Sequence, residues 1–330
     1  MPKIAFFELE PWEAEYLKGK LRGFQVDCFN HSLSVKDLPA LKAADAIGVF
    51  IYSPVTAKLI EKLPKLKLVA TLSTGFDHVD LKACKKRGIK VCNVPEYGSR
   101  TVAEHTFALL LSLSRKIPQS AERTKRGGFG LEGLRGVDLA GKTIGIIGLG
   151  RIGKNVAEIA KAFGMRVLGV DPFVKRVSGV EIVSLKQLLK ECDVITLHTP
   201  LNEKTRHLLN SKTLKEVKKG AVLINTARGG LVDTPALLEA LKEKRISAAG
   251  LDVLEEECVI REEKELLQEA FKKKCDFKVA LAQHALIAQD NVLVTPHNAF
   301  NSQEALERIL DTTIENVKSF FTAKPINVVA

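Results

Sequence analysis

The chain has 330 residues, of which 45% are apolar and 27% charged, and its formal net charge is +11. This length allows one large domain or two of medium size, and the composition is typical of a soluble globular protein, not of a disordered one. The longest apolar stretch, residues 107–114, is far too short to span a bilayer, and the first residues lack the pattern of a secretory signal.

The N-terminal third alternates short apolar stretches with amphipathic ones. Residues 3–8, 46–51, 67–72 and 91–94 predict buried strands. Residues 11–21, 56–64 and 77–88 have the spacing of helices, and the last of them ends at a glycine. This alternation predicts a parallel sheet with helices packed on its faces.

A more apolar segment follows at residues 99–119. It begins with polar cap residues, continues apolar for about three turns and stops before Pro118, so it predicts a buried helix. We expect this helix to lie in an interdomain seam or in a subunit interface. The glycine-rich residues 126–136 predict an exposed, mobile loop.

The middle of the chain repeats the alternation. Strands are predicted at 142–150, 166–171, 193–200, 220–227, 246–253 and 291–297, and helical segments separate them. This pattern predicts a second doubly wound sheet. The last strand follows a long insertion at 258–290, and residues 301–324 predict one amphipathic helix.

The first strand of this second sheet leads into GLGRIG, residues 148–153. Gly148 permits a tight turn, Gly150 lets the backbone approach a pyrophosphate, and Gly153 lets the following helix pack on the strand. Asp171 ends the next strand, where a carboxylate accepts hydrogen bonds from ribose hydroxyls and disfavours a 2′-phosphate. Strand, glycines, helix and acid together predict a dinucleotide site that prefers NAD to NADP.

Three polar residues follow later strands of the same predicted sheet, namely Arg228, Glu257 and His297. Ligands of such sheets bind at the carboxyl ends of the strands. An arginine can bind the carboxylate of a 2-oxo acid, a histidine can protonate the nascent alkoxide, and a carboxylate can orient that histidine. Each residue also has a structural interpretation, because Arg228 could pair with an interdomain acid, Glu257 is one of three consecutive glutamates, and His297 could be packed.

The chain resembles the D-isomer-specific 2-hydroxyacid dehydrogenases over nearly its whole length. The resemblance is carried by STGFDHVDL, VPEYGSRTVAEHTFALLL, GKTIGIIGLGRIG, NTARGGLVD, GLDVLEEE and VTPHNAF. It implies a catalytic arginine at Arg228, a glutamate at Glu257, an acid–base histidine at His297, and backbone amides of Thr74 and Gly75 that bind the substrate carboxylate. It implies cofactor contacts, beyond the glycines, from Arg151, Ile152, Asp171, Thr199, Pro200, Thr205, Thr226, Ala227, Arg228 and Asp252.

Within that family, Tyr52, Tyr97 and Phe300 resemble the pocket residues of the D-lactate dehydrogenase branch. They imply a small apolar pocket for the methyl group of pyruvate, and therefore the NADH-dependent reduction of pyruvate to D-lactate. A hydroxypyruvate or glyoxylate reductase, or an enzyme for a larger 2-oxo acid, is the alternative. An NADH-sensing scaffold related to transcriptional co-repressors is a third interpretation, which a triad of these residues does not exclude.

The resemblance also implies the domain organisation. Residues 1–98 and 299–330 would form a flavodoxin-like catalytic domain, residues 99–298 a Rossmann NAD-binding domain, and substrate would bind in a cleft between them. A homodimer is implied, with the helix at 101–116 at its interface. Six cysteines without paired spacing predict free thiols in the cytoplasm and no metal site. The positive charge is attributed to a lysine-rich solvated surface, so neither nucleic acid nor membrane is expected as a partner.

Overall fold

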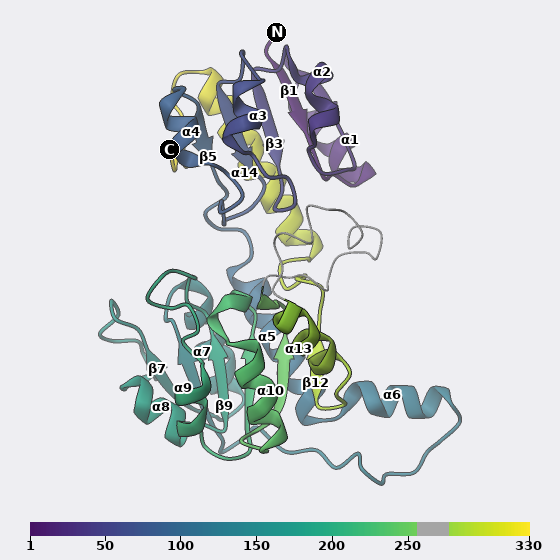
Figure 1. Cartoon of the computed structure of the whole chain (residues 1–330), viewed down its shortest axis with the longest axis vertical. Helices are drawn as coiled ribbons and strands as arrows, with labels where there is room; N and C mark the ends of the chain where they lie inside the picture. Colours follow the sequence, from purple (N-terminus) through teal and green to yellow (C-terminus); the bar gives the residue numbers. More distant parts are fainter. Residues whose placement is uncertain (256–276) are drawn as a thin grey trace. The chain divides into compact units, whose positions relative to one another are not determined.

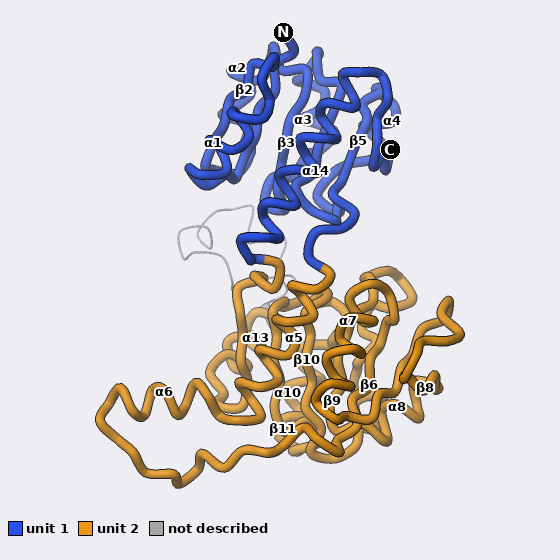
Figure 2. Tube along the Cα trace, turned by 180° about the vertical axis from the view of Figure 1, so that it is seen from behind, with its two compact units in different colours: residues 1–98, 301–330 blue, residues 99–300 orange. Residues whose placement is uncertain are grey.

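The computed structural model describes residues 1–255 and 277–330, which form two compact units. Unit 1 comprises Met1–Gly98 and Asn301–Ala330, and unit 2 comprises Ser99–Phe300 (Figure 2). The sequence placed the second boundary at 298/299. In the structure Ala299 donates its backbone N–H to the Asp252 carboxylate at 2.9 Å, which attaches this residue to unit 2.

Unit 1 is built on a parallel sheet that, in the part described, has five strands in the order β2-β1-β3-β4-β5 (Figure 1). This is the flavodoxin-like strand order of a doubly wound sheet. The strands are β1 (Lys3–Phe6), β2 (Gln25–Cys28), β3 (Ala46–Val49), β4 (Leu68–Thr71) and β5 (Lys90–Cys92). The helices are α1 (Pro11–Lys20), α2 (Leu38–Leu41), α3 (Ala57–Glu61), α4 (Leu81–Lys86) and α14 (Gln303–Phe321), with a 3-10 turn η1 at Val35–Asp37.

Alternate side chains along β1 and the residue after it are buried on opposite sides of the strand. Ala5 and the following Phe7 pack with residues of α2, α3 and α4, whereas Ile4 and Phe6 are buried on the opposite side of the strand. Helix α14 contacts β4 and α1, so the C-terminal helix supplies a layer of the N-terminal unit. Its buried positions recur at helical spacing, which is the amphipathic pattern seen in the sequence.

The chain end extends this sheet beyond β5. Val328 forms an antiparallel bridge with Cys92, and the Val91 N–H donates to the Ala330 carbonyl at 2.9 Å. In return, the Val329 N–H donates to the Val91 carbonyl at 2.8 Å. The last residues therefore cover an edge that β5 would otherwise leave unpaired.

Unit 2 holds a parallel sheet whose described strands number seven, in the order β12-β11-β10-β9-β6-β7-β8. This is the Rossmann order with one added strand. From the first strand, β6, the chain builds the sheet outwards in one direction to β7 and β8, and then in the other direction from β9 onwards. The strands are β6 (Thr143–Ile147), β7 (Arg166–Val170), β8 (Glu181–Ile182), β9 (Val194–Leu197), β10 (Ala221–Asn225), β11 (Ile246–Leu251) and β12 (Val292–Val294). The helices are α5 (Ser99–Ser114), α6 (Ile117–Lys125), α7 (Arg151–Ala162), α8 (Leu185–Glu191), α9 (Ser211–Glu216), α10 (Thr234–Lys242) and α13 (Phe277–Ile287), with a 3-10 turn η2 at Gly229–Leu231.

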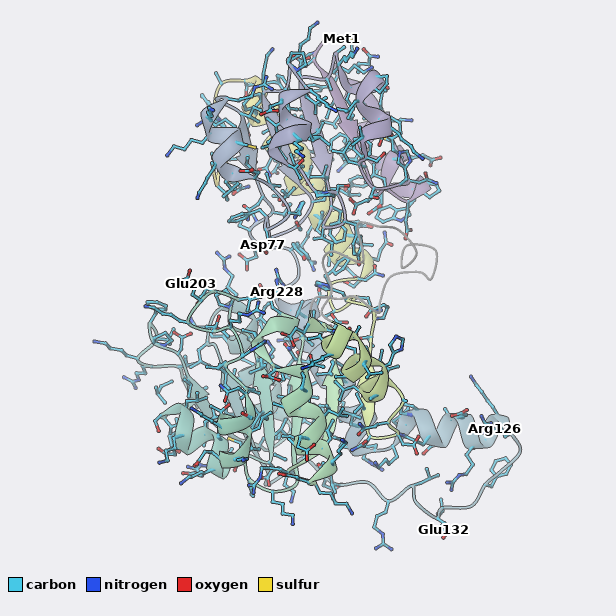
Figure 3. The ribbon with its side chains drawn as sticks, in the orientation of Figure 1. Met1, Asp77, Arg126, Glu132, Glu203 and Arg228 are labelled. Atoms are coloured by element: carbon cyan, nitrogen blue, oxygen red, sulfur yellow. The ribbon has the colours of Figure 1, made fainter. Side chains whose placement is uncertain are left out.

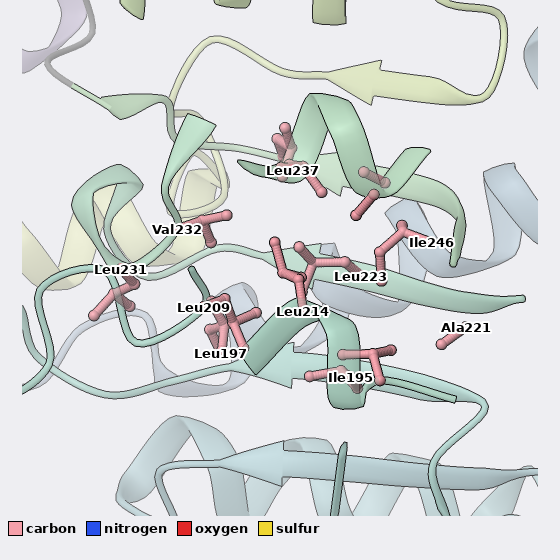
Figure 4. Close-up of a cluster of buried hydrophobic side chains, with 14 of the residues drawn as sticks. Ile195, Leu197, Leu209, Leu214, Ala221, Leu223, Leu231, Val232, Leu237 and Ile246 are labelled. Atoms are coloured by element: carbon pink, nitrogen blue, oxygen red, sulfur yellow. The ribbon is translucent and has the colours of Figure 1, made fainter. Parts of the chain in front are cut away.

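The two faces of this sheet carry separate cores. Helices α8, α9, α10 and α13 pack on one face around Leu197, Leu223 and Leu237 (Figure 4). Helices α5 and α7 pack on the other around Phe107 and Val156. The apolar side of α5 is therefore filled by the core of its own unit, so its apolar character requires no second subunit.

The structure adds elements that were not predicted from the sequence. Strands β2 and β8 were missed; β2 has no fully buried residue and β8 has two residues, so neither has the apolar run of a core strand. Helix α6 was also missed, because Pro118 lies in its first turn, where proline is tolerated. Together α6 and the residues up to 138 form an arm that projects from unit 2 (Figure 1). None of the described helices is both long and apolar enough to cross a membrane.

Candidate functional site

The carboxyl ends of β10, β11 and β12 lie side by side in unit 2. Asn225 pairs with Leu251, and Leu251 pairs with Val294, so these strands end at one level of the sheet. Arg228 and His297 each follow three residues after such an end. Parallel pairing therefore brings together, at one edge, two residues that are 69 positions apart in the sequence. Figure 3 shows Arg228 at this edge of the unit, on the same side as Glu203.

The loop that carries Arg228 is held from within. The Asn225 carboxamide accepts a hydrogen bond from the Ala227 N–H at 3.0 Å and donates to the Arg228 carbonyl at 2.9 Å. The Arg228 guanidinium donates to the Ala227 carbonyl at 2.8 Å. A Cβ on Gly229 would lie 2.0 Å from the Leu254 carbonyl, so only glycine lets this loop approach the residues after β11 so closely.

Asp252 shapes the turn that carries His297. Its carboxylate is fully buried and accepts from Thr295 Oγ1 at 2.5 Å, from the Asn298 N–H at 3.0 Å and from the Ala299 N–H at 2.9 Å. Its backbone carbonyl accepts from the His297 N–H at 2.9 Å. His297 adopts a left-handed backbone with φ 52°, a conformation that is costly for a histidine and that these four bonds enforce. The carboxylate of Asp252 thus holds the protein's own turn, and the contact with the cofactor stays a prediction.

Glu257 lies outside the described residues. The first of the three consecutive glutamates, Glu255, is 4% exposed and bonds to His207 Nε2 at 2.5 Å and Thr234 Oγ1 at 2.9 Å. Glu255 is therefore committed to the interior of unit 2.

The glycine loop has the geometry of a pyrophosphate cradle. Gly148 has φ 98°, and a Cβ there would lie 2.5 Å from the His198 carbonyl. A Cβ on Gly153 would lie 2.0 Å from the Gly148 carbonyl, whereas one on Gly150 would meet no protein atom within 4 Å. Arg151 and Ile152 open α7, whose N-terminal N–H groups lack a side-chain cap. The loop is closed towards the protein and open at Gly150, so it fits the phosphates of a dinucleotide.

Asp171 directly follows β7 and bonds to the backbone around it. One carboxylate oxygen accepts from the Leu149 N–H at 2.8 Å, which ties it to the glycine loop. The other accepts from the N–H groups of Phe173 at 2.8 Å and Val174 at 3.1 Å. A carboxylate oxygen has more than one lone pair, so these bonds leave acceptor capacity for ribose hydroxyls.

The loop after β9 faces the glycine loop across the point where the strand order reverses. Thr199 and Pro200 begin it, and Thr205 closes it by donating to the Pro200 carbonyl at 2.6 Å. Directly after the next strand, β10, Thr226 Oγ1 lies 3.0 Å from Thr106 Oγ1 of α5.

His198 lies in the same region and was not predicted from the sequence. Its Nε2 lies 2.9 Å from Thr196 Oγ1, and burial lowers its pKa to about 3. This histidine therefore stays neutral beside Gly148.

The remaining predicted residues, those proposed to bind the substrate, lie in loops between helices and strands. Thr74 is exposed and Gly75 partly buried after β4 of unit 1, and Tyr97 and Phe300 are partly buried. Tyr52 is 46% exposed, and its backbone N–H donates to the Glu8 carboxylate at 3.1 Å.

Glu8 is a further residue that was not predicted from the sequence. It also accepts a hydrogen bond from the hydroxyl of buried Ser53, and burial raises its pKa. Glu8 ends the first predicted strand, and that placement was the one signal in the sequence that could have singled it out.

Comparison with known proteins agrees with this geometry. Residues 107–299 match the model of the D-isomer specific 2-hydroxyacid dehydrogenase NAD binding domain, more than half of the chain. A D-lactate dehydrogenase of Escherichia coli (strain K12) is 37% identical over 324 residues, 96% of each chain. A glycerate dehydrogenase of Methylorubrum extorquens is 39% identical over 282 residues, 84% of this chain and 82% of the relative.

A solved structure shares the fold at similar identity. The D-lactate dehydrogenase from Aquifex aeolicus, complexed with NAD and lactic acid, is 37% identical, has a TM-score of 0.85, and matches over 97% of this chain and 96% of the other. The glycine loop, the strand order and these matches agree on NAD as the cofactor. The chain belongs to the D-isomer specific 2-hydroxyacid dehydrogenase family and is an NAD-dependent oxidoreductase.

Proposed function

We propose that the protein reduces pyruvate to D-lactate. The observation that carries the proposal is the placement of Arg228 and His297 on one sheet edge, after strands whose ends are in register. NADH, when bound at the glycine loop, supplies the hydride that C2 of the 2-oxo acid accepts. The residues of this chain supply binding, orientation and the proton.

In this proposal Arg228 binds the substrate through charge-assisted hydrogen bonds and stabilises the charge that develops on the C2 oxygen. His297 donates the proton to that oxygen as the C2–H bond forms, which completes the 2-hydroxy acid. Glu257 holds the histidine in the productive tautomer. The backbone N–H groups of Thr74 and Gly75 bind the carboxylate.

The choice of pyruvate rests on the resemblance of Tyr52, Tyr97 and Phe300 to the pocket residues of the D-lactate dehydrogenase branch. The D-lactate dehydrogenases among the relatives support it. A hydroxypyruvate or glyoxylate substrate is the second candidate, because a glycerate dehydrogenase and a glyoxylate reductase are 39% and 36% identical over most of this chain. Both candidates use the same residues, so only the pocket distinguishes them.

We also propose a homodimer formed through the arm of unit 2. Its side chains include Phe129 and Leu131, which are 81% and 83% exposed. Arg123 donates to the Gly130 and Glu132 carbonyls at 2.6 and 2.8 Å, so the arm has a defined turn. A cytoplasmic location is part of the proposal and is supported by the free thiols of the cysteines at 28, 84, 92 and 192.

The test is NADH oxidation with a panel of 2-oxo acids and chiral analysis of the product. Rapid turnover of pyruvate to D-lactate, with glyoxylate, hydroxypyruvate and phenylpyruvate slow, is the expected result. Preference for another acid would keep the chemistry and reassign the substrate. Binding of NADH with no turnover of any acid would replace the enzyme with a nucleotide sensor.

A further inference from the structure

Three consecutive peptide groups after β4 turn their carbonyl oxygens into unit 1. The Ser73 carbonyl accepts from the Val94 N–H at 3.1 Å. The Thr74 carbonyl accepts from Asn93 Nδ2 at 2.8 Å, and the Gly75 carbonyl accepts from Ser73 Oγ at 2.6 Å. Each peptide plane is therefore fixed by a partner on the inner side of the loop.

A trans peptide directs its N–H opposite to its C=O. With the three carbonyls held inward, the N–H groups of Thr74, Gly75 and Phe76 are directed outward, and within residues 1–255 and 277–330 they have no hydrogen-bond acceptor. Successive outward N–H groups form a concavity suited to an anion such as a carboxylate. The Thr74 carbonyl and the Gly75 N–H belong to the same peptide group. The hydrogen bond from Asn93 to the Thr74 carbonyl therefore also sets the orientation of the Gly75 N–H.

Asn93 is itself held by two asparagines near the chain end. Its carbonyl accepts from Asn316 Nδ2 at 2.8 Å, and Asn316 Oδ1 accepts from Asn327 Nδ2 at 2.8 Å. The Asn93 N–H donates to the Asn327 carbonyl at 3.1 Å. We call Asn93, Asn316 and Asn327 the asparagine ladder.

Burying the asparagine ladder costs free energy, because its carboxamides lose their hydrogen bonds to water. Asn316 is 0% and Asn93 7% exposed, and Asn316 occupies a core position of α14 where an apolar residue would pack without needing partners. Asn316 connects the C-terminal segment to Asn93, which follows β5, and the Asn93 carboxamide in turn donates to the loop after β4. A purely structural contact between α14 and the residue after β5 would not need an Asn93 carboxamide that donates to the Thr74 carbonyl.

We propose that the asparagine ladder positions the Thr74–Gly75 peptide for the substrate carboxylate, so that the C-terminal segment takes part in building the substrate site. The inference rests on the proposed function above, in which these N–H groups bind that carboxylate. The three asparagines act through the peptide and are positioning residues.

The decisive variant is Asn93→Ala, which removes the donor to the Thr74 carbonyl. We expect the KM for pyruvate to rise about 10-fold, the size of effect of one hydrogen bond to a charged group, with a smaller fall in kcat. The Kd of NADH, measured by fluorescence titration, should not change, because the glycine loop belongs to unit 2. Thr313→Ala is the control, since Thr313 is fully buried on α14, the helix that carries Asn316, and its Oγ1 has no partner among the described residues.

A second variant keeps the test decisive should Asn93→Ala fail to fold. Asn327 is only partly buried and has φ 53°, so Asn327→Gly removes the carboxamide and keeps the backbone conformation. We expect a KM rise of about threefold, as for one neutral hydrogen bond. A lowered Tm with an unchanged KM in both variants, or an equal loss of NADH affinity, would overturn the inference. A wild type that turns over no 2-oxo acid would instead reject the proposed function.

Discussion

Buried polar side chains fix the backbone of each loop at the site. Asp252 bonds to the turn of His297, Asn225 to the loop of Arg228, and Asn93 to Thr74. A side chain that reacts with substrate must be accessible to it. Its position therefore has to be set by neighbouring residues whose own hydrogen-bonding groups are paired within the protein. These neighbours are small polar residues with at least two partners each.

Substitutions of the two reacting side chains should affect different kinetic parameters. Arg228→Ala should mainly raise KM for the 2-oxo acid, by about 10- to 100-fold, and also lower kcat, because it removes a charge-assisted hydrogen bond. His297→Ala should mainly lower kcat, by about 100-fold or more, because it removes the proton donor. Steady-state kinetics with saturating NADH measures both, and near-wild-type turnover by His297→Ala would show that the proton comes from elsewhere.

His198 should make the fold sensitive to acid. Its folded pKa is about 3, below the ordinary 6.5, so the unfolded chain binds the proton more readily. The contribution of the neutral His198 ring to the free energy of unfolding is therefore fully present above pH 6.5 and is lost as the pH falls towards 3. For this residue the loss is about 2 kcal/mol at pH 5. Urea unfolding at pH 7.5 and pH 5.0 should show a smaller loss for His198→Gln than for wild type.

The control for this histidine is His284→Gln, an exposed position on α13. It should retain the pH dependence of wild type. An identical loss of stability in wild type and His198→Gln would mean that this ring is not kept neutral by the fold.

At the scale of elements, the glycine loop between β6 and α7 contains glycines that are needed for two different reasons, packing within the protein and binding of the cofactor. Gly153 is needed by the protein, because its Cβ would collide with the Gly148 carbonyl at 2.0 Å. Gly150 has open space around its Cβ position, so we attribute its glycine to the close approach of the cofactor.

Alanine at each position should reveal this difference. Gly153→Ala should lower the apo-protein Tm and weaken NADH binding together. Gly150→Ala should leave the apo Tm within about 2 °C of wild type, as expected of a substitution that meets no strain, and raise the Kd of NADH at least about 10-fold. Thermal unfolding and NADH titration of both variants measure this, and unchanged NADH affinity in Gly150→Ala would place the pyrophosphate elsewhere.

At the scale of the whole molecule, the exposed apolar side chains of the arm predict its assembly. Replacing Phe129 and Leu131 together with aspartate should convert a dimer to a monomer, because burying two charges at an apolar contact is costly. Light scattering after size exclusion gives the mass. Val35→Asp, at a position 66% exposed in unit 1, is the control and should keep the wild-type mass. A mass unaffected by the double change would exclude the arm as the interface.

The sequence alone determined the alternation of strands and helices, the glycine loop, the family and NAD, because these depend on local periodicity and short motifs. The parallel sheets and their helices were predicted from spacing, and the strands without an apolar run, β2 and β8, were missed. Arg228 and His297 were proposed from their positions after strands. Their joint catalytic role stays a prediction.

Only the tertiary structure decided which distant residues meet. Strand register brought the ends of β10, β11 and β12 to one edge, and it turned Asp252 towards the His297 turn. The core of unit 2 filled the apolar face of α5, which from the sequence alone could equally have faced a partner. The hydrogen bond from Asn316 to Asn93 joins residues 223 positions apart. No local pattern encodes such a pair, because its stabilisation exists only once the chain has closed around it.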